Sequence, residues 1–329
     1  MLTPNRPALV LAPMEGITDA PMRALQGMSG AFTYAVSEFL RVSSEPIPPR
    51  IFLRDVPELG RGGRTSTDLP VQVQILGGDP GLMAESARSA VDAGAAAIDI
   101  NFGCPAKTVN RHDGGASLLR YPSRILEIVA AVRSSVPSEI PVSAKLRLGW
   151  DSIDAIFENA SAAVNGGASW ITIHARTRVQ GYLPPVYWPR IGEIREQVSV
   201  PVIANGDIWT LADFQRCRSE TGCLHYMIGR GVLANPLLPT QIAIELGILP
   251  GPAQSDWSDL DWLRILRSLQ LHTEETANSH PEYLVMRFKQ WLKLARNHGC
   301  FSHFDAIKGT RTTPDFFAAL EEALLVKLA

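Results

Sequence analysis

The segment Asn101–Asn110, with the sequence NFGCPAKTVN, brings a thiol, an ammonium group and side-chain amides close together in the chain. It follows an apolar run, Ala95–Ile100, whose composition is typical of a buried strand. Gly103 and Pro105 flank Cys104 and favour an irregular loop over a helix. Enzymes built from alternating strands and helices carry their chemistry just past the carboxyl ends of the strands. We therefore interpret Cys104 as a catalytic residue rather than a core residue.

Polar or charged side chains also end most of the other predicted strands. Burying so many polar groups around one opening is unfavourable unless a ligand satisfies them. We therefore expect these side chains to converge on a ligand site, although each alone is compatible with an ordinary polar strand end. They are Gln74, Asn101, Lys145, Arg147, His174 and Asn205, with Arg230 just after the last strand.

Two glycine turns indicate a phosphate site. Asn205–Asp207 (NGD) follows the seventh predicted strand and Gly229–Gly231 (GRG) follows the eighth. Loops at these positions commonly bind phosphate through backbone N–H groups and a helix N-terminus, and Arg230 would add a charge-assisted hydrogen bond. Two plain glycine turns are the alternative. The first strand ends in Ala12–Gly16 (APMEG), where Met14 is suited to pack over a flat ring.

Eight short β-rich runs alternate with amphipathic helical stretches, which predicts βαβ units and a closed parallel (β/α)8 barrel, the TIM barrel. A doubly wound open sheet is the alternative. The predicted strands are Leu9–Ala12, Thr33–Ser37, Val71–Leu76, Ala97–Asn101, Val142–Leu148, Trp170–His174, Val202–Asn205 and Tyr226–Gly229. The helical stretches include Pro80–Ala93, Ser117–Ser134, Ile153–Asn165, Tyr187–Gln197 and Leu211–Ser219.

The composition changes at residues 246–253 (LGILPGPA), a Pro/Gly-rich stretch that is typical of a linker. From Trp257 to Ala329 the pattern is helical, without a convincing strand. We therefore place the barrel at residues 1–247, a linker at 248–257 and a small all-helical domain at 258–329. The stretch Tyr283–Arg311 in that domain is locally basic.

Composition limits the class of protein. With 329 residues and 46% hydrophobic content, the chain supports a large core, and its net charge of −2 gives no global nucleic-acid signature. The sequence has no run of about 18 apolar residues, so we expect no membrane span. The four cysteines form no C-x-x-C pair and no signal-peptide pattern opens the chain, which favours reduced thiols and a cytoplasmic location. We expect no metal site.

Seven motifs in a fixed order resemble those of the tRNA-dihydrouridine synthase family, and they extend through the whole predicted barrel. They are APMEG at Ala12–Gly16, NxGCPxKxV at Asn101–Val109, GGAxLL at Gly114–Leu119, KLRLGW at Lys145–Trp150, HART at His174–Thr177, NGDI at Asn205–Ile208 and GRG at Gly229–Gly231. The resemblance implies FMN as prosthetic group, NADPH as reductant and the D-loop of tRNA as substrate.

The resemblance also implies a role for each matching residue. It assigns Pro13 and Met14 to the flavin lining, Gln74 and Lys145 to the edge of the ring, and His174 to the cofactor. It assigns the phosphate end to Asn205, Gly206, Asp207, Gly229 and Arg230, the target base to Asn101 and Arg176, and proton donation to Cys104. These roles are chemically consistent, because a cysteine with a pKa of about 8.5 is mostly protonated at neutral pH and can act as a general acid.

Because net charge gives no RNA signature, tRNA contacts must come from local basic groups. Within the family a helical C-terminal domain grips tRNA. We therefore expect contacts from Arg41, Lys107 and Arg147 in the barrel and from Arg287, Lys289 and Arg296 in the helical domain. Glu15-Gly16, Phe39–Val42 and Arg287–Trp291 resemble the C-type bacterial subgroup, which implies reduction of uridine 16. We expect a monomer without a protein partner.

Three alternatives remain at this point. A small-molecule FMN dehydrogenase of the dihydroorotate or enoate type would keep the fold and the flavin, but it would not need a basic helical domain. A phosphate-binding barrel lyase would use Lys145 as a Schiff-base amine and would be colourless. For a non-catalytic tRNA binder, Cys104 would be dispensable.

Overall fold

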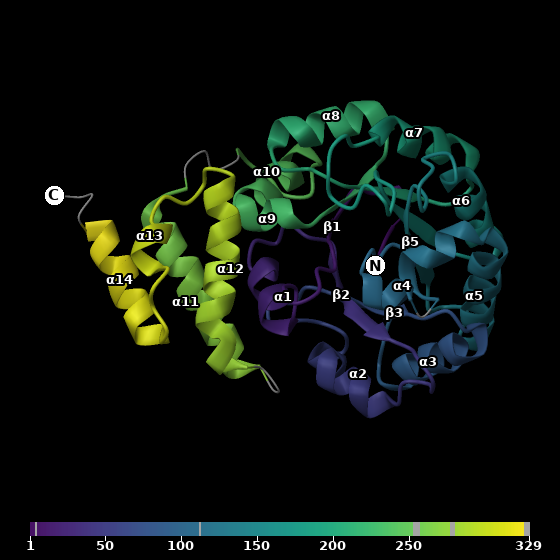
Figure 1. Ribbon diagram of the computed structural model, residues 1–329, viewed down its shortest axis with the longest axis horizontal. Coiled ribbons are helices and arrows are strands. Elements are labelled where there is room, and N and C mark those ends of the chain that lie inside the picture. The colour runs from purple at the N-terminus through teal and green to yellow at the C-terminus, as the bar shows by residue number, and fades with distance from the viewer. Residues whose placement is uncertain (4, 112, 253–256, 277–279, 326–329) are drawn as a thin grey trace.

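The computed structural model describes residues 1–3, 5–111, 113–252, 257–276 and 280–325, and its larger part is a closed barrel of parallel strands ringed by helices (Figure 1). Each strand pairs with the next in sequence, and β8 pairs with β1. The predicted (β/α)8 barrel is confirmed, and the open-sheet alternative is wrong. The strands are β1 (Ala8–Leu11), β2 (Tyr34–Arg41), β3 (Val71–Leu76), β4 (Ile98–Asn101), β5 (Val142–Arg147), β6 (Trp170–His174), β7 (Val202–Asn205) and β8 (His225–Ile228).

The strands are covered on both faces, which explains their short and nearly continuous apolar sequences. Side chains alternate between the barrel interior and the surrounding helices. In β1, for example, Leu9 and Leu11 belong to the large core beneath the helices, whereas Val10 belongs to a separate interior cluster. Tyr34, Val36, Trp170, Ile203 and Met227 complete that cluster with Ala12, and Met1 and Leu2 pack against it.

Strand β2 is longer than predicted, because it continues past Ser37 to Arg41. Its pairing with β3 shifts register between Val36 and Phe39. Glu38 lies in this irregular part of the strand, which resembles a β-bulge. Arg41 is therefore the last residue of β2 rather than a residue beyond it.

The predicted helical stretches are present, with their ends displaced by a few residues. One of them, Ser117–Ser134, is divided at Pro122, which has no N–H to continue a helix and instead begins α5. Helices α1, α2, α4 and α10, whose bounds are given next, were not predicted. The barrel helices are α1 (Ala20–Gly27), α2 (Pro49–Asp55), α3 (Pro80–Asp92), α4 (Lys107–Asn110), α5 (Pro122–Ser135), α6 (Ile156–Asn165), α7 (Trp188–Gln197), α8 (Leu211–Thr221), α9 (Arg230–Ala234) and α10 (Leu238–Glu245), with the 3₁₀ helices η1 (Pro57–Arg61) and η2 (Gly115–Arg120).

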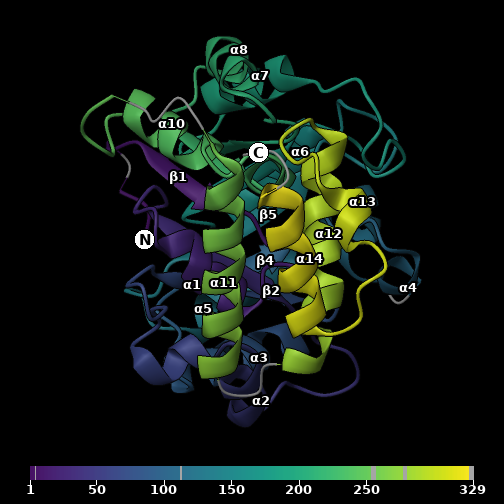
Figure 2. The same ribbon diagram turned by 90° about the vertical axis from the view of Figure 1, so that its left-hand side faces the viewer.

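A helical region follows the barrel and packs beside it (Figures 1 and 2). It contains α11 (Asp259–Glu275), η3 (Pro281–Tyr283), α12 (Leu284–Asn297), α13 (Phe304–Ile307) and α14 (Thr313–Leu325). Ser258 and Asp261 form a capping box that begins α11. Trp291 of α12 is buried and donates its indole N–H to the carbonyl of Leu233 in α9 at 2.8 Å, which joins the helical region to the barrel.

The proposed domain limits at residues 247 and 258 stay a prediction. Residues 253–256 of the predicted linker, and residues 277–279 and 326–329 of the predicted helical domain, lie outside the described residues. Within the described ranges, no helix combines the length and the apolar character needed to cross a membrane.

Candidate active site

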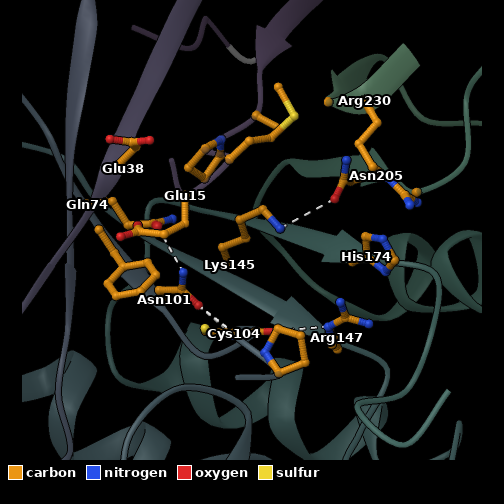
Figure 3. A pocket seen from close by; sticks show the side chains of 18 of the residues that line it. Glu15, Glu38, Gln74, Asn101, Cys104, Lys145, Arg147, His174, Asn205 and Arg230 are labelled. Atoms are coloured by element: carbon orange, nitrogen blue, oxygen red, sulfur yellow. Dashed lines mark hydrogen bonds between the residues drawn. The ribbon is translucent and has the colours of Figure 1, made fainter. Parts of the chain in front are cut away.

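A cavity of about 310 Å³ opens where the carboxyl ends of the barrel strands meet (Figure 3). Its lining comes from nearly every strand of the barrel, as expected for an active site in this fold. All the residues for which the resemblance implied a cofactor contact line it, namely Pro13, Met14, Gln74, Lys145, His174, Asn205, Gly206, Asp207, Gly229 and Arg230, and so do Asn101, Cys104 and Arg147. The convergence of polar strand ends is thus confirmed, whereas the role of each residue stays a prediction.

The loop that carries Cys104 is held by hydrogen bonds to Asn101, the last residue of β4. The side-chain oxygen of Asn101 accepts the N–H groups of Gly103 and Cys104, each at 2.9 Å. Burial raises the pKa of the Cys104 thiol, as does Glu15, while a backbone hydrogen bond to Ala106 and two nearby cations lower it; the net shift is upward. The thiol is therefore protonated at neutral pH.

A buried polar network lies beneath this loop and connects β3, β4 and β5. The Gln74 amide donates to Asp99 at 2.7 Å and accepts from Asn101 at 2.9 Å. The hydroxyl of Ser143 donates to the same carboxyl at 2.5 Å. Burial raises the pKa of Asp99 to about 6, although these hydrogen bonds and Lys145 oppose the shift. Gln74, predicted to bond the ring of a cofactor, therefore has both amide ends bonded to protein groups.

Two basic side chains at the centre of the cavity have lowered pKa values. Burial, followed by repulsion from Arg147, lowers the pKa of Lys145 to about 8, and its ammonium group lies 3.4 Å from the side-chain oxygen of Asn205. Burial and the surrounding cations lower the pKa of His174 well below its usual value, so that its imidazole is neutral. Its Nδ1 is buried and has no hydrogen-bond partner among the residues that the structure describes.

At the opposite end of the cavity, Asp207 joins two arginines. Its carboxylate pairs with Arg176 and, at 3.1 Å, with Arg230. Burial opposes ionisation, but the two guanidinium groups hold the pKa of Asp207 below its usual range. Its φ of +51° is in the left-handed region, which is uncommon for an aspartate and often marks functional sites. The carboxylate of Asp207 thus holds Arg230 in place, and its place at the phosphate end stays a prediction.

Three of the residues expected to touch tRNA or its base, Asn101, Arg147 and Arg176, are buried. Arg176 has no exposed surface, and the guanidinium group of Arg147 donates to the carbonyls of Gly103, Thr177 and Gly181. In this conformation the guanidinium group of Arg147 bonds to protein carbonyls, whereas Arg176 pairs with Asp207 through one nitrogen and its Nε and Nη1 are buried without a hydrogen-bond partner among the described residues. Arg147 thereby holds the loop of Cys104 against the loop that follows β6.

The other residues expected to bind tRNA lie outside the cavity. Arg41 and Lys107 are exposed near its rim. In the helical region, Arg287 pairs with Asp19 of the barrel at 2.6 Å. Lys289 donates to the carbonyl of Lys308 at 2.9 Å and also to that of Thr310, and Arg296 lies 3.5 Å from Asp305.

Sequence reasoning assigned no site role to three polar side chains that line the cavity. Glu15 lies in the loop after β1, Glu38 lies within β2, and Tyr182 comes from the loop after β6. Glu38 accepts the N–H of Ile17 at 3.0 Å, and burial, reinforced by Glu15 and Asp19, raises its pKa to about 7. A carboxylate inside a buried strand was a signal for Glu38, whereas no pattern indicated Tyr182.

The cavity therefore offers a protonated thiol, an ammonium group, a neutral imidazole and a guanidinium group around one space. Such a set is suited to binding an extended anionic ligand at one end and to delivering a proton at the other. In the part of the chain that the structure describes, no three His, Cys, Asp or Glu side chains form a set that could hold a metal ion.

Comparison with known proteins agrees with this site. A family profile described as dihydrouridine synthase (Dus) matches residues 10–299. The chain is 41% identical to the tRNA-dihydrouridine(16) synthase of Shewanella oneidensis, covering 96% of this chain and 98% of that protein, and 41% identical to that of Haemophilus influenzae, covering 95% and 99%. Histamine dehydrogenase from Rhizobium sp. 4-9 shares the fold alone, with a TM-score of 0.55 and 11% identity over 80% of this chain and 49% of that one. The chain belongs to the dihydrouridine synthase family.

Proposed function

We propose that this protein reduces the C5=C6 bond of uridine 16 in the D-loop of tRNA to 5,6-dihydrouridine, with FMN as prosthetic group, NADPH as reductant and Cys104 as proton donor. Membership of the family and relatives named for position 16 support the reaction and its target. The observation that carries the mechanism is the placement of the Cys104 thiol, whose pKa burial raises, in the cavity that also contains Lys145, His174 and Arg230.

The residues present fit FMN. The cavity has the size of a small-molecule site, and the partnerless Nδ1 of His174 is a buried polar atom that a ligand could satisfy. Lys145 and His174 would hold the ring, and Arg230, between the glycine turns at Gly206 and Gly229, would hold the phosphate. When bound and reduced, FMN supplies the hydride that adds to C6 of uracil.

The remaining chemistry falls to side chains of this chain. The Cys104 thiol gives its proton to C5 of the base, and Lys145 and Arg147 stabilise the thiolate that remains, since both lower its pKa. Lys145 is still mostly protonated at pH 7, because its pKa is about 8, and it favours negative charge in the cavity. Asn101 fixes the direction of the thiol through the backbone of the loop.

The target base must leave its stack to reach this thiol. Arg41 ends β2 and Lys107 follows Cys104, so both exposed cations lie at the rim that the D-loop has to approach. Contacts between tRNA phosphates and these rim cations would supply part of the binding affinity. Further phosphate contacts would come from Arg287, Lys289 and Arg296 of the helical region. We infer that the protein acts as a monomer in the cytoplasm.

The test uses purified full-length protein, NADPH and an unmodified tRNA transcript. We expect the visible spectrum of a bound flavin, its bleaching by NADPH and its return on addition of tRNA, with dihydrouridine mapped to position 16. Reduction at another position of the D-loop would contradict the assigned target. A flavin-loaded protein that forms no dihydrouridine would contradict the reaction.

A further inference from the structure

A row of stacked side chains connects the rim of the cavity with the helical region. The guanidinium carbon of Arg230 lies 4.3 Å from the ring centroid of Tyr182 and 4.8 Å from that of Trp209. Trp209 in turn stacks on His298, with ring centroids 4.0 Å apart and planes inclined by 15°. Asp207 accepts from the same guanidinium group at 3.1 Å. Arg230 is therefore held by two rings and one carboxylate.

The outer members of this row come from different parts of the chain. Trp209 lies in the loop between β7 and α8, whereas His298 directly follows α12 of the helical region. Trp209 is half-buried, and the exposed ring of His298 covers one of its faces. The helical region thus supplies the group that completes the stacking around Arg230.

His298 is suited to this position because its ring is neutral. Partial burial, followed by repulsion from Arg230, lowers the pKa of His298, while Asp207 opposes the shift. A neutral imidazole can stack on Trp209 without placing a second positive charge close to the guanidinium group. The contact therefore adds rigidity to the row without changing the charge that Arg230 offers to a ligand.

We propose that Trp209 and His298 are positioning residues that fix Arg230 for the cofactor phosphate, so that the helical region contributes to flavin binding. This inference rests on the proposed function, because it takes Arg230 as the group that binds the phosphate of FMN. An arginine side chain loses much rotational freedom when it binds a ligand. A guanidinium group already held between Tyr182 and Trp209 has lost that freedom before the phosphate arrives, which strengthens binding.

Riboflavin separates this role from a purely structural one. FMN and riboflavin share the ring and the ribityl chain and differ in the phosphate. A residue that acts through Arg230 should change the affinity for FMN and leave the affinity for riboflavin unchanged. A residue that only supports the fold should change both.

The experiment titrates FMN and riboflavin into full-length protein after removal of its flavin and follows the quenching of flavin fluorescence. We expect Trp209→Ala and His298→Ala to weaken FMN binding by about threefold to tenfold, the range for one lost cation–π or stacking contact, with riboflavin unaffected. Trp209→Phe and His298→Phe keep an aromatic ring in the row and should retain most of the affinity. Lys293→Ala, an exposed change on α12, is the matched control and should bind both flavins as the unmodified protein does.

Arg230→Ala provides the reference, because it should lose FMN affinity selectively. Adding His298→Ala to Arg230→Ala should weaken FMN binding no further, since His298 acts through Arg230. If Arg230→Ala loses FMN affinity selectively but the alanine variants at Trp209 and His298 do not, the positioning role alone is wrong. If those variants weaken FMN and riboflavin equally, the row is structural. If Arg230→Ala keeps full FMN affinity, its phosphate role in the proposed function is wrong and this inference falls with it.

Discussion

The side-chain oxygen of Asn101 accepts the backbone N–H of Cys104 at 2.9 Å, and the same oxygen accepts the N–H of Gly103 (Figure 3). The amide nitrogen of Asn101 donates to Gln74, so β3 and β4 together determine where the loop begins. The thiol of Cys104 is therefore positioned by the sheet rather than by contacts within the loop alone. Rigid support of this kind is what a proton donor needs in order to reach one carbon atom of a base.

Replacing Cys104 with alanine should slow uridine reduction by about 10²-fold or more, because a general acid contributes about 10²- to 10⁴-fold. The FMN-loaded protein should otherwise remain intact, since the thiol is not needed to hold the cofactor phosphate. The measurement is the single-turnover oxidation of reduced protein on mixing with tRNA. An alanine variant with the normal rate would rule out Cys104 as the proton donor.

The same assay predicts a pH profile. Burial raises the pKa of the thiol, so the protonated form that donates persists through neutral pH. The rate of reduction should stay level there and fall in the alkaline range, as the thiol loses its proton. A rate that rises with pH across that range would indicate that a thiolate, rather than a thiol, is the active form.

Asn101→Ala should destabilise the loop of Cys104. Two N–H groups of the loop would lose their acceptor, which predicts a decrease of about 2 kcal/mol in the free energy of unfolding and a lower kcat. Asn110→Ala is the matched comparison, because Asn110 donates to the carbonyls of Cys104 and Ala106, so it holds the same loop from within rather than from the sheet. Urea unfolding should separate the two variants, and equal effects would contradict the role of Asn101.

Much of the fold follows from patterns in the chain. Buried strands such as Val71–Leu76 and Trp170–His174 are short runs rich in β-branched residues, and their predicted limits are those observed. Helix α1 was missed because it is short and begins at a cap, Asp19, that the predicted periodicity did not include. The predicted limit of strand β2 stopped at Ser37, too early, because Glu38 interrupts the apolar pattern.

The site was less predictable, because its geometry depends on which residues of neighbouring strands face each other. Asp99 lies opposite Ser143 in the pairing of β4 with β5, and no motif reveals that register. Sequence also does not distinguish a buried arginine from an exposed one. Arg147 and Arg41 both end strands, yet Arg147 bonds to three carbonyls in the interior while Arg41 is exposed.

Glu38→Gln should stabilise the protein in a pH-dependent manner. Burial raises the pKa of Glu38 from 4.5 to about 7 in the folded state. Between pH 4.5 and about pH 7, the folded protein therefore holds a proton on Glu38 that the unfolded chain has already lost. The free energy of unfolding accordingly falls as the pH rises through this window. Glutamine does not ionise and can still accept the N–H of Ile17.

The stability advantage of the Gln variant should therefore be near zero at pH 4 and reach at most about 3 kcal/mol above pH 7. Urea unfolding of both proteins at several pH values measures it. An advantage that is the same at all pH values would show that Glu38 is ionised in the folded state as readily as in the unfolded chain.

Arg23→Met should be strongly destabilising. Arg23 of α1 and Glu58 of η1 form two hydrogen bonds of 2.8 Å, and their side chains are only 1% and 5% exposed. Removing the arginine leaves a buried carboxylate without its partner, which predicts a loss of about 3–5 kcal/mol. Arg23→Met combined with Glu58→Met should recover most of it, whereas Arg54→Met, in an exposed pair, should change stability by less than about 1 kcal/mol.

Removing exposed cations at the rim should weaken tRNA binding and reduce its dependence on salt. Arg41→Ala and Lys107→Ala each remove one expected phosphate contact, which lowers the slope of log K against log salt by about 1. Lys289→Ala should have a smaller effect on the slope, because its ammonium group already bonds to the carbonyls of Lys308 and Thr310. Arg88→Ala removes an exposed charge on α3 and is the control for net charge. Unchanged slopes for Arg41→Ala and Lys107→Ala, together with a large change for Lys289→Ala, would mean that tRNA approaches over the helical region and opens the contacts of Lys289 as it binds.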